Sequence, residues 1–233
     1  MINKNIKIVI LAGGKGKRFN PFSFVIPKPL MPIGEKPILE LIINQLIKSG
    51  IKHVTITVMN NYDIFKSLFP QSKFPKIKID FIVEKKPLGT TGALKIIKNL
   101  PENFLAMNGD IITNINFQKL YSFHKKSKSD LTMCVKTISS KIEYGTVEID
   151  KNNLLKRFKQ KPIIKNNINL GIYVMKKKLI RNINLSKNFG FDKLIKNISN
   201  KRVSVYKSNC KWFDVGREKD LFEAKNFILK KKN

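Results

Sequence analysis

The residues best suited to chemistry lie in a glycine-rich segment near the amino terminus. Gly13, Gly14 and Gly16 have no side chains to hold the backbone away from a ligand, so their NH groups can line an anion-binding nest. Basic residues bring positive charge to the same segment at Lys15, Lys17, Arg18 and Lys28. Such a loop suits a polyphosphate. Its spacing is neither the GxxxxGK[ST] of a P-loop nor GxGxxG, so neither an ATPase nor a dinucleotide-dependent dehydrogenase is indicated.

Two aspartates form a second candidate group. Asp110 follows the apolar run 104–107 in the sequence AMNGD, and a carboxylate at the end of a strand is well placed to hold Mg²⁺. Asp214 lies in the short apolar sequence WFDVG, where a charge is costly unless it is paired with a metal. Two carboxylates, phosphate oxygens and water would complete the octahedral coordination that Mg²⁺ requires.

Glu84 begins a third segment, EKKPLGTTG, which joins a predicted strand to a predicted helix. An ionised Glu can only accept hydrogen bonds. Guanine offers NH donors at N1 and N2, uracil and thymine offer one at N3, and unprotonated cytosine offers no ring NH. A carboxylate at this position that contacted a nucleotide base would therefore favour GTP over CTP and leave UTP and dTTP as alternatives.

Strand-like and helix-like segments alternate through the first half of the chain. This alternation predicts a mostly parallel sheet covered by helices on both faces, with ligands at the carboxyl ends of its strands. The predicted elements of this half are strands at 6–11, 54–58, 78–84 and 104–107 and helices at 37–49 and 62–69, with a further helix capped by Thr90 or Thr91 and ending at Asn99. The second half has predicted strands at 131–136, 146–150, 154–159 and 170–175 and helices at 192–198 and 218–229.

Length, composition and charge restrict the class of protein. We expect the 233 residues to form one domain over 1–229, with two halves that meet at about residue 125, and a basic tail at 230–233. The net charge of +30 is scattered over the whole chain, which predicts a solvated surface and no specific nucleic-acid partner.

Cysteines, histidines and hydropathy add further exclusions. Cys134 and Cys210 form no CxxC pair, so neither a zinc site nor a disulfide is predicted. His53 and His124 lie outside any catalytic pattern, and we expect both to be structural. No apolar stretch approaches the roughly 20 residues that cross a bilayer, which predicts a cytoplasmic enzyme without a membrane partner.

The segment LAGGKGKRFNPFSFVIPKPLMPIGEKPILE, residues 11–40, resembles the signature of the sugar-1-phosphate nucleotidylyltransferases, LAGGxGTRLxPLTxxxPKPLxPVxxKPxIE. Lys17 stands where that family usually has Thr. Further elements follow in family order up to about Phe227, and they resemble PLGTxGAL, NGD, YGxVE, EKP, NAGIY and WxDVG. The resemblance implies a Rossmann-like three-layer α/β/α sandwich with a mostly parallel central sheet and a small sugar-binding β subregion. It also implies that the half up to about residue 125 binds the nucleotide and that the half over 126–229 binds the sugar phosphate.

The resemblance also implies roles for individual residues. The implied nucleotide-binding residues are Leu11, Ala12, Gly13, Gly14, Lys15, Gly16, Lys17, Glu84, Gly89, Thr90, Asn108 and Gly109. The implied sugar-phosphate-binding residues are Tyr144, Gly145, Glu148, Gln160, Lys161 and Asn169. Arg18 and Mg²⁺ would bind the triphosphate, Lys28 the reacting phosphates, and Asp110 and Asp214 the metal. Gln160 replaces the usual Glu, which favours a sugar other than plain glucose or mannose.

The implied reaction is attack by a sugar 1-phosphate oxygen on the α-phosphorus of a nucleoside triphosphate, GTP favoured, giving NDP-sugar and pyrophosphate in a bacterial surface-glycan pathway. Two alternatives stay open. A phosphocholine-type cytidylyltransferase shares the loop chemistry, but it needs a pocket, usually aromatic, for a cationic head group. A basic binding module could keep the fold without turnover. The sequence leaves the oligomeric state open, a homo-oligomer included.

Overall fold

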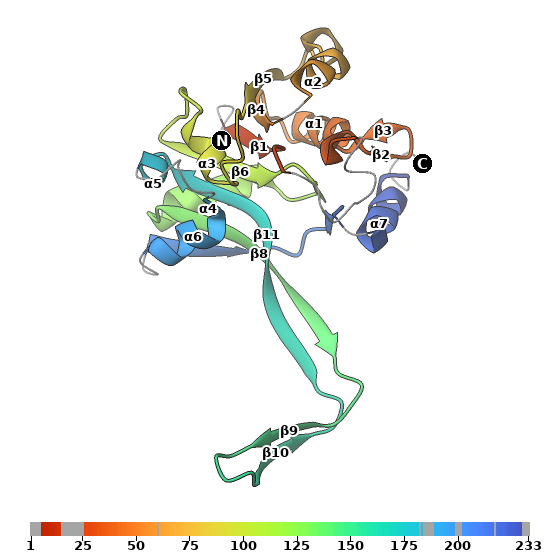
Figure 1. Cartoon of the computed structure of the whole chain (residues 1–233), viewed down its shortest axis with the longest axis vertical. Helices are drawn as coiled ribbons and strands as arrows, with labels where there is room; N and C mark the ends of the chain where they lie inside the picture. Colours follow the sequence, from red (N-terminus) through yellow and green to blue (C-terminus); the bar gives the residue numbers. More distant parts are fainter. Residues whose placement is uncertain are drawn as a thin grey trace.

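A seven-stranded sheet lies at the centre of the molecule in the computed structural model shown in Figure 1. The structure describes residues 6–14, 26–59, 61–181, 183, 189–198, 202–216 and 218–229. The strands follow one another in space as β12 (Val203–Lys207), β8 (Leu131–Lys141), β11 (Ile163–Lys176), β6 (Asn103–Asn108), β1 (Lys7–Leu11), β4 (His53–Val58) and β5 (Lys78–Val83). Within this described sheet only β11 runs antiparallel to its neighbours.

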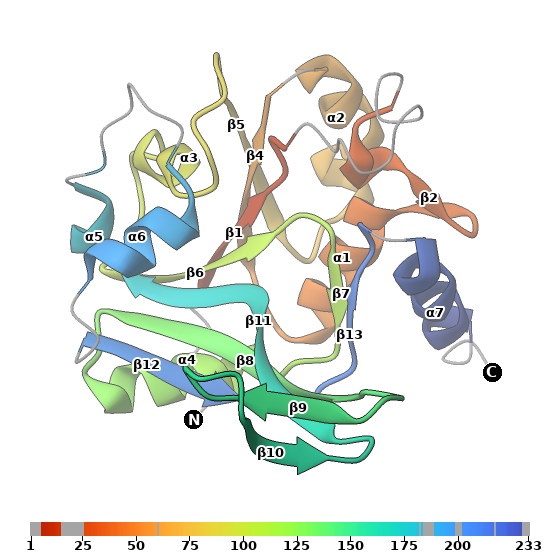
Figure 2. The same cartoon turned by 60° about the horizontal axis from the view of Figure 1, so that its bottom comes forward.

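Helices cover both faces of the sheet and create two hydrophobic cores. Ile8 and Ile10 of β1 pack in one core with α1 (Ile38–Lys48), α2 (Tyr62–Leu68) and α4 (Phe117–Ser127). Val9 and Leu11 belong to the other core, with α3 (Gly92–Lys95), α5 (Lys178–Arg181) and α6 (Phe191–Asn197), which gather on one side in Figure 2. Successive strand residues point to opposite faces, so one apolar run supports both cores. These layers confirm the predicted α/β fold class.

Helix α1 shows how local sequence produces this packing. Its apolar residues Leu39, Ile42, Ile43 and Leu46 recur at helical spacing, and all four are fully buried, as predicted. Gly50 ends the helical segment with φ at 75°, a left-handed conformation that glycine adopts without steric cost.

Two short antiparallel pairs lie beside the main sheet. One pair joins β2 (Pro32–Ile33) to β3 (Lys36–Pro37). The other joins β7 (Ile111–Thr113) to β13 (Trp212–Asp214), with Asp214 opposite Ile111, and helix α7 (Glu218–Leu229) follows β13. The second pair sets residues from the two ends of the chain side by side.

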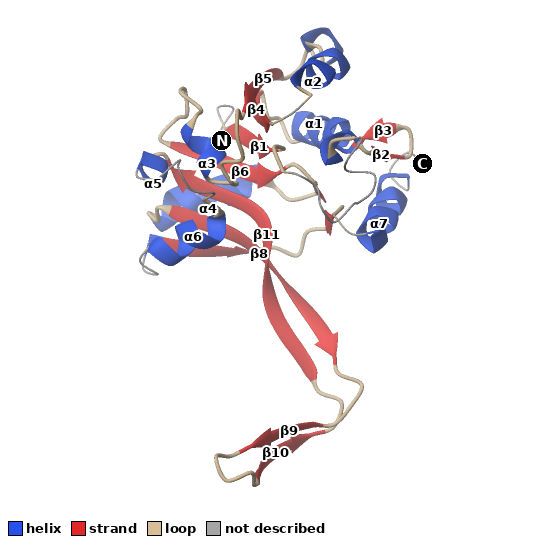
Figure 3. Cartoon of the chain, viewed as in Figure 1, coloured by secondary structure: helices blue, strands red, loops and turns tan. Residues whose placement is uncertain are grey.

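A long hairpin projects from the sheet. Strands β8 and β11 stay paired as far as Lys141 and Ile163, and a second small pair, β9 (Thr146–Ile149) with β10 (Leu155–Lys159), forms the tip. We call residues 137–167 the arm. Figure 1 shows the arm pointing away from the body of the molecule, and Figure 3 shows that it consists of strands and loops.

Several predicted elements differ from the structure. The helix expected to run to Asn99 ends at Lys95, and Thr91 does not cap it, because its hydroxyl donates a hydrogen bond to the Phe189 carbonyl at 2.7 Å. Helix α4 and strand β12 were not predicted, and β8 and β11 extend well beyond the predicted strands. No helix within the described ranges is long and apolar enough to cross a membrane.

Candidate active site

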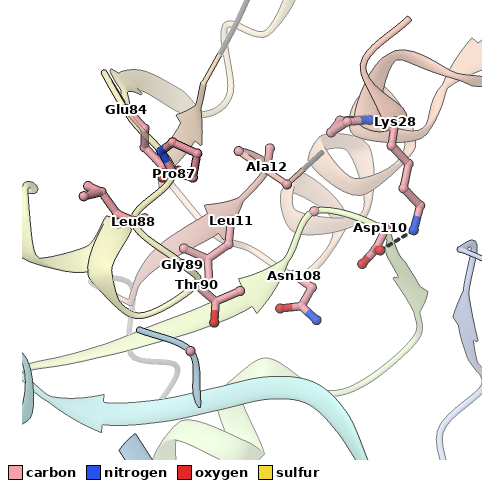
Figure 4. Close-up of a pocket in the computed structure, with 16 residues that line it drawn as sticks. Leu11, Ala12, Lys28, Glu84, Pro87, Leu88, Gly89, Thr90, Asn108 and Asp110 are labelled. Carbon is pink, nitrogen blue, oxygen red and sulfur yellow. Dashed lines mark hydrogen bonds and ion pairs between the residues drawn. The ribbon is translucent and has the colours of Figure 1, made fainter. Parts of the chain in front are cut away.

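A pocket of about 670 Å³ opens at the carboxyl ends of β1 and β6. The chain proceeds from β1 to β4 and β5 on one side and then returns to place β6 on the other, so this is the point where the strand order reverses. The pocket residues, drawn in Figure 4, are Leu11, Ala12, Gly13, Gly14, Lys28, Pro29, Glu84, Pro87, Leu88, Gly89, Thr90, Ala93, Asn108, Gly109, Asp110 and Gly190. Nine of the twelve predicted nucleotide-binding residues are among them, together with Lys28 and Asp110.

Glycines allow two loops to meet at the base of this pocket. The Gly109 amide donates a hydrogen bond to the Leu11 carbonyl at 2.9 Å. A Cβ on Gly109 would lie 3.0 Å from that carbonyl oxygen and 3.1 Å from the Ala12 Cα, so a side chain would force the two backbones apart. A Cβ on Gly13 would overlap the Glu84 carboxylate. The glycines therefore set the distance between the first loop and the walls around it.

Glu84 stands in the pocket wall where β5 ends and is only 5% exposed. Its backbone amide donates to the Val58 carbonyl at 2.8 Å, which continues the pairing of β5 with β4. Burial raises the pKa of the Glu84 carboxyl, and interactions with the Thr57 hydroxyl and the Leu88 backbone offset only part of this rise. The wall thus holds a buried hydrogen-bond acceptor that favours a ligand with NH donors.

Lys28 brings the two predicted metal ligands together. Its ammonium group forms an ion pair with Asp110 and lies 3.9 Å from an Asp214 carboxylate oxygen. The Val215 amide donates to the Asp110 carbonyl at 3.0 Å, so the pairing of β7 with β13 fixes the two aspartates as neighbours. Lys28 itself is buried in a 3₁₀ turn, Lys28–Leu30, that follows Pro27.

The carboxylate pair suits a hard cation. The side chains of Asp110 and Asp214 are 19% and 24% exposed, so neither carboxylate is fully buried. In the part of the chain that the structure describes, no group of three or more His, Cys, Asp or Glu side chains could hold a metal. Substrate oxygens and water would therefore have to complete the coordination of Mg²⁺, as this cation prefers.

The predicted sugar-phosphate residues do not reach the pocket. Five of them lie on the arm, namely Tyr144, Gly145, Glu148, Gln160 and Lys161. These residues lie apart from the pocket within a single copy of the chain, because the continuous β8–β11 pairing holds the tip away from the body (Figure 1). Asn169 lies at the base of the arm, where its Oδ1 accepts a hydrogen bond from the Gly171 amide at 3.0 Å. The sugar-binding role of all six residues stays a prediction.

Four predicted residues, Lys15, Gly16, Lys17 and Arg18, lie outside the described residues. One pocket segment was missed by the sequence reasoning. Gly190 lines the pocket because the segment around it pairs with the loop after Glu84, where the Phe189 amide donates to the Leu88 carbonyl at 2.9 Å. A glycine directly before a helix with Asp192 in its first turn was the available sequence signal.

The histidines have structural partners, as predicted. His53 Nε2 lies 2.5 Å from an Asp80 carboxylate oxygen. The buried His124 ring contacts the Thr132 hydroxyl at 2.8 Å and the Asn103 side-chain oxygen at 3.1 Å, and burial lowers its pKa to about 4. Burial raises the pKa of the Cys134 thiol to about 12. Neither histidine lines the pocket, so no imidazole base is present in the pocket wall that the structure describes.

Comparisons with known proteins show the family to which the chain belongs. The chain is 35% identical over 192 residues to D-glycero-alpha-D-manno-heptose 1-phosphate guanylyltransferase of Campylobacter jejuni, which covers 82% of this chain and 85% of the relative. It is 32% identical over 224 residues to the enzyme of that name from Aneurinibacillus thermoaerophilus, covering 94% and 96%. The crystal structure of HddC from Yersinia pseudotuberculosis complexed with GMP-PN superposes with a TM-score of 0.75 at 26% identity, covering 96% of this chain and 99% of that one. The Nucleotidyl transferase family model matches residues 7–231, so the chain belongs to that family and is a nucleotidyltransferase.

Proposed function

We propose that this enzyme transfers the guanylyl group of GTP to a sugar 1-phosphate with the help of Mg²⁺ and releases pyrophosphate. The observation that carries the proposal is one pocket that combines the glycine loop, the buried Glu84 acceptor and the Lys28–Asp110 ion pair, with Asp214 beside it. Similarity to heptose 1-phosphate guanylyltransferases supports both the donor and the class of acceptor.

The bond changes require little from a general base. An oxygen of the sugar 1-phosphate attacks the α-phosphorus of GTP, the new O–P bond forms, and the bond to the bridging oxygen of pyrophosphate breaks. The second pKa of a phosphate monoester is about 6, so the nucleophile is already anionic near neutral pH. This agrees with the lack of an imidazole among the described pocket residues.

Catalysis then depends on position and charge. Backbone NH groups of Gly13 and Gly14 can bind phosphate oxygens, and the buried ammonium of Lys28 supplies positive charge close to the reacting phosphates. Asp110 and Asp214 would hold Mg²⁺, which neutralises negative charge on the triphosphate when bound. Holding the two anionic reactants in line lowers the barrier, because their reaction then takes place within one complex.

The Glu84 carboxylate favours guanine over uracil, thymine and cytosine. Guanine can donate two NH groups to it, uracil and thymine only one, and unprotonated cytosine no ring NH. The described pocket lining also contains no aromatic side chain that could hold a cationic head group, which disfavours phosphocholine as the acceptor.

A panel of substrates tests this proposal directly. Pyrophosphate release is measured with GTP, UTP, dTTP and CTP against heptose, mannose and glucose 1-phosphates and phosphocholine, with and without Mg²⁺. We expect turnover with GTP and a hexose or heptose 1-phosphate, and its loss without Mg²⁺. Preferential use of CTP, or of phosphocholine, would contradict the proposal.

The variant Asp110→Ala separates chemistry from binding. It should abolish turnover while binding of the sugar phosphate persists. Asp63→Ala is a matched control, because Asp63 is an exposed aspartate in the first turn of α2, away from the pocket. Full activity of the Asp110→Ala enzyme would refute the role of this carboxylate.

A further inference from the structure

The arm has no core of its own. None of the residues 137–167 is buried. Among the described residues, each ion pair of the arm beyond Thr137 joins two of its own residues, such as Lys141 with Glu143 and Arg157 with Glu148. A two-stranded hairpin without a packing partner is marginally stable in water. The arm therefore needs a surface to cover it.

One face of the arm's tip is apolar. The register of β9 with β10 sets Val147 opposite Phe158 and Ile149 opposite Leu155. These four side chains are 58–65% exposed, although neighbours on one face of a hairpin normally pack against a core. The opposite face is polar, with Glu148 beside Arg157. An exposed apolar patch with a polar reverse side is typical of a protein interface.

The surface area of the chain agrees with a missing partner. The chain exposes 14291 Å² of accessible surface. A compact protein of 26.9 kDa would expose about 10,800 Å². The surplus of about 3,500 Å² for one chain exceeds the roughly 600–1,000 Å² that each partner of a stable interface buries. Figure 1 shows that the arm projects from the body of the molecule.

The arm also contains the residues that the pocket lacks. The sequence elements that resemble the family's sugar-phosphate site, with Lys161 as the phosphate contact, lie at the tip, whereas the nucleotide pocket lies in the body. Basic residues outnumber acidic residues in the arm. A cationic tip is complementary to a pocket that holds a triphosphate and a sugar phosphate.

From these observations we infer that two copies of this chain exchange arms, so that the tip of one copy covers the pocket of the other and completes its sugar-phosphate site. The assignment of the tip residues rests on the proposed function. A two-fold arrangement gives both arms a covering surface at once and leaves no open contact surface. The pairing of β8 with β11 runs without a break from Asn169 to Ile163, so a tip that turned back onto its own pocket would have to break this ladder.

Complementation between two inactive variants tests the exchange. Asp110→Ala inactivates the body and Lys161→Ala inactivates the tip. The two proteins are prepared separately, mixed, partially unfolded and then allowed to reassociate. In an exchanged dimer the mixed species has one site with both residues intact, so random pairing should restore about a quarter of the wild-type activity. Sites built from a single chain would give no restoration, which would overturn the inference. A mixture of Asp110→Ala with Lys151→Ala is the control for reassociation, because Lys151 lies in the exposed β9–β10 turn.

Light scattering gives a readout that does not depend on activity. We expect the wild-type chain to be a dimer, and a variant in which an Asn-Gly turn replaces residues 141–163 to be a folded monomer, because no buried residue is removed. A monomeric wild-type chain, or a shortened variant that remains dimeric, would overturn the exchange. If the wild-type dimer released no pyrophosphate with any substrate, the proposed function would fail, and the scattering result would still decide the arm exchange.

Discussion

The substitution Glu84→Gln should affect catalysis and stability in opposite directions. Glu84 is 5% exposed, and burial raises the pKa of its carboxyl, so the folded state disfavours the charged form at neutral pH. The amide has nearly the same shape and no charge. We therefore expect the free energy of unfolding without ligand to rise in the variant.

Guanine recognition should weaken in the same variant. Hydrogen bonds to a charged group contribute about 1.5–3 kcal/mol, which corresponds to a loss of roughly 10–100-fold in kcat/KM for GTP. ITP lacks the N2 amino group and can donate only from N1 to Glu84. The wild-type enzyme should therefore prefer GTP over ITP, and this preference should largely disappear in Glu84→Gln, whose amide oxygen is the sole remaining acceptor.

The assay is pyrophosphate release with GTP and ITP, together with thermal unfolding of the ligand-free proteins. Glu40→Gln is a matched control, because Glu40 is a buried acid in α1 that pairs with Lys36 and Lys73 outside the pocket. These partners lower the pKa of the Glu40 carboxyl, so this variant should lose stability and keep its preference for GTP. An unchanged preference for GTP over ITP in Glu84→Gln would refute the recognition of guanine by this carboxylate.

Three further outcomes follow from the same geometry. Lys28→Met should lower kcat about 10²–10³-fold in the pyrophosphate assay, because it removes the cation beside Asp110, whereas equal turnover would exclude Lys28 from the chemistry. Gly109→Ala should cost about 1–3 kcal/mol in thermal unfolding, because its Cβ meets the first loop's backbone at 3.0 Å, while Gly14→Ala, which meets nothing within 4 Å, should change stability by less than about 0.5 kcal/mol. Burial lowers the pKa of the His124 imidazole to about 4, so the ring binds a proton more readily in the unfolded chain than in the folded protein. The free energy of unfolding should therefore fall by about 2 kcal/mol between pH 7 and pH 5. Urea unfolding of His124→Gln should show that this pH dependence is lost.

Local sequence was sufficient to predict an element wherever the residues of that element also contain the pattern that identifies it. The apolar run of β1, the helical spacing in α1 and the glycines of the first loop all lie where the sequence predicted. Helix α4 could also have been found, because its buried residues recur at helical spacing and Asn116 caps it by accepting a hydrogen bond from the Lys119 amide at 2.9 Å.

Helix α3 was predicted too long for a physical reason that the local pattern does not contain. Threonines before an apolar segment indicate a helix cap, but the Thr91 hydroxyl donates instead to the Phe189 carbonyl, almost a hundred residues away. The same contact brings Gly190 into the pocket. When a side chain has two possible hydrogen-bond partners, the tertiary fold decides between them, and the neighbouring sequence does not.

The sequence by itself determined the family, the mostly parallel α/β sheet and the glycine loop, because these depend on residue types at short and fixed spacing. Only the tertiary structure decided that Lys28, Asp110 and Asp214 meet, because the antiparallel pairing of β7 with β13 joins segments about a hundred residues apart. Only the tertiary structure showed that the arm lies away from the pocket. Pairing between strands extends as far as the backbone geometry allows, and the pattern of apolar residues does not show where it stops.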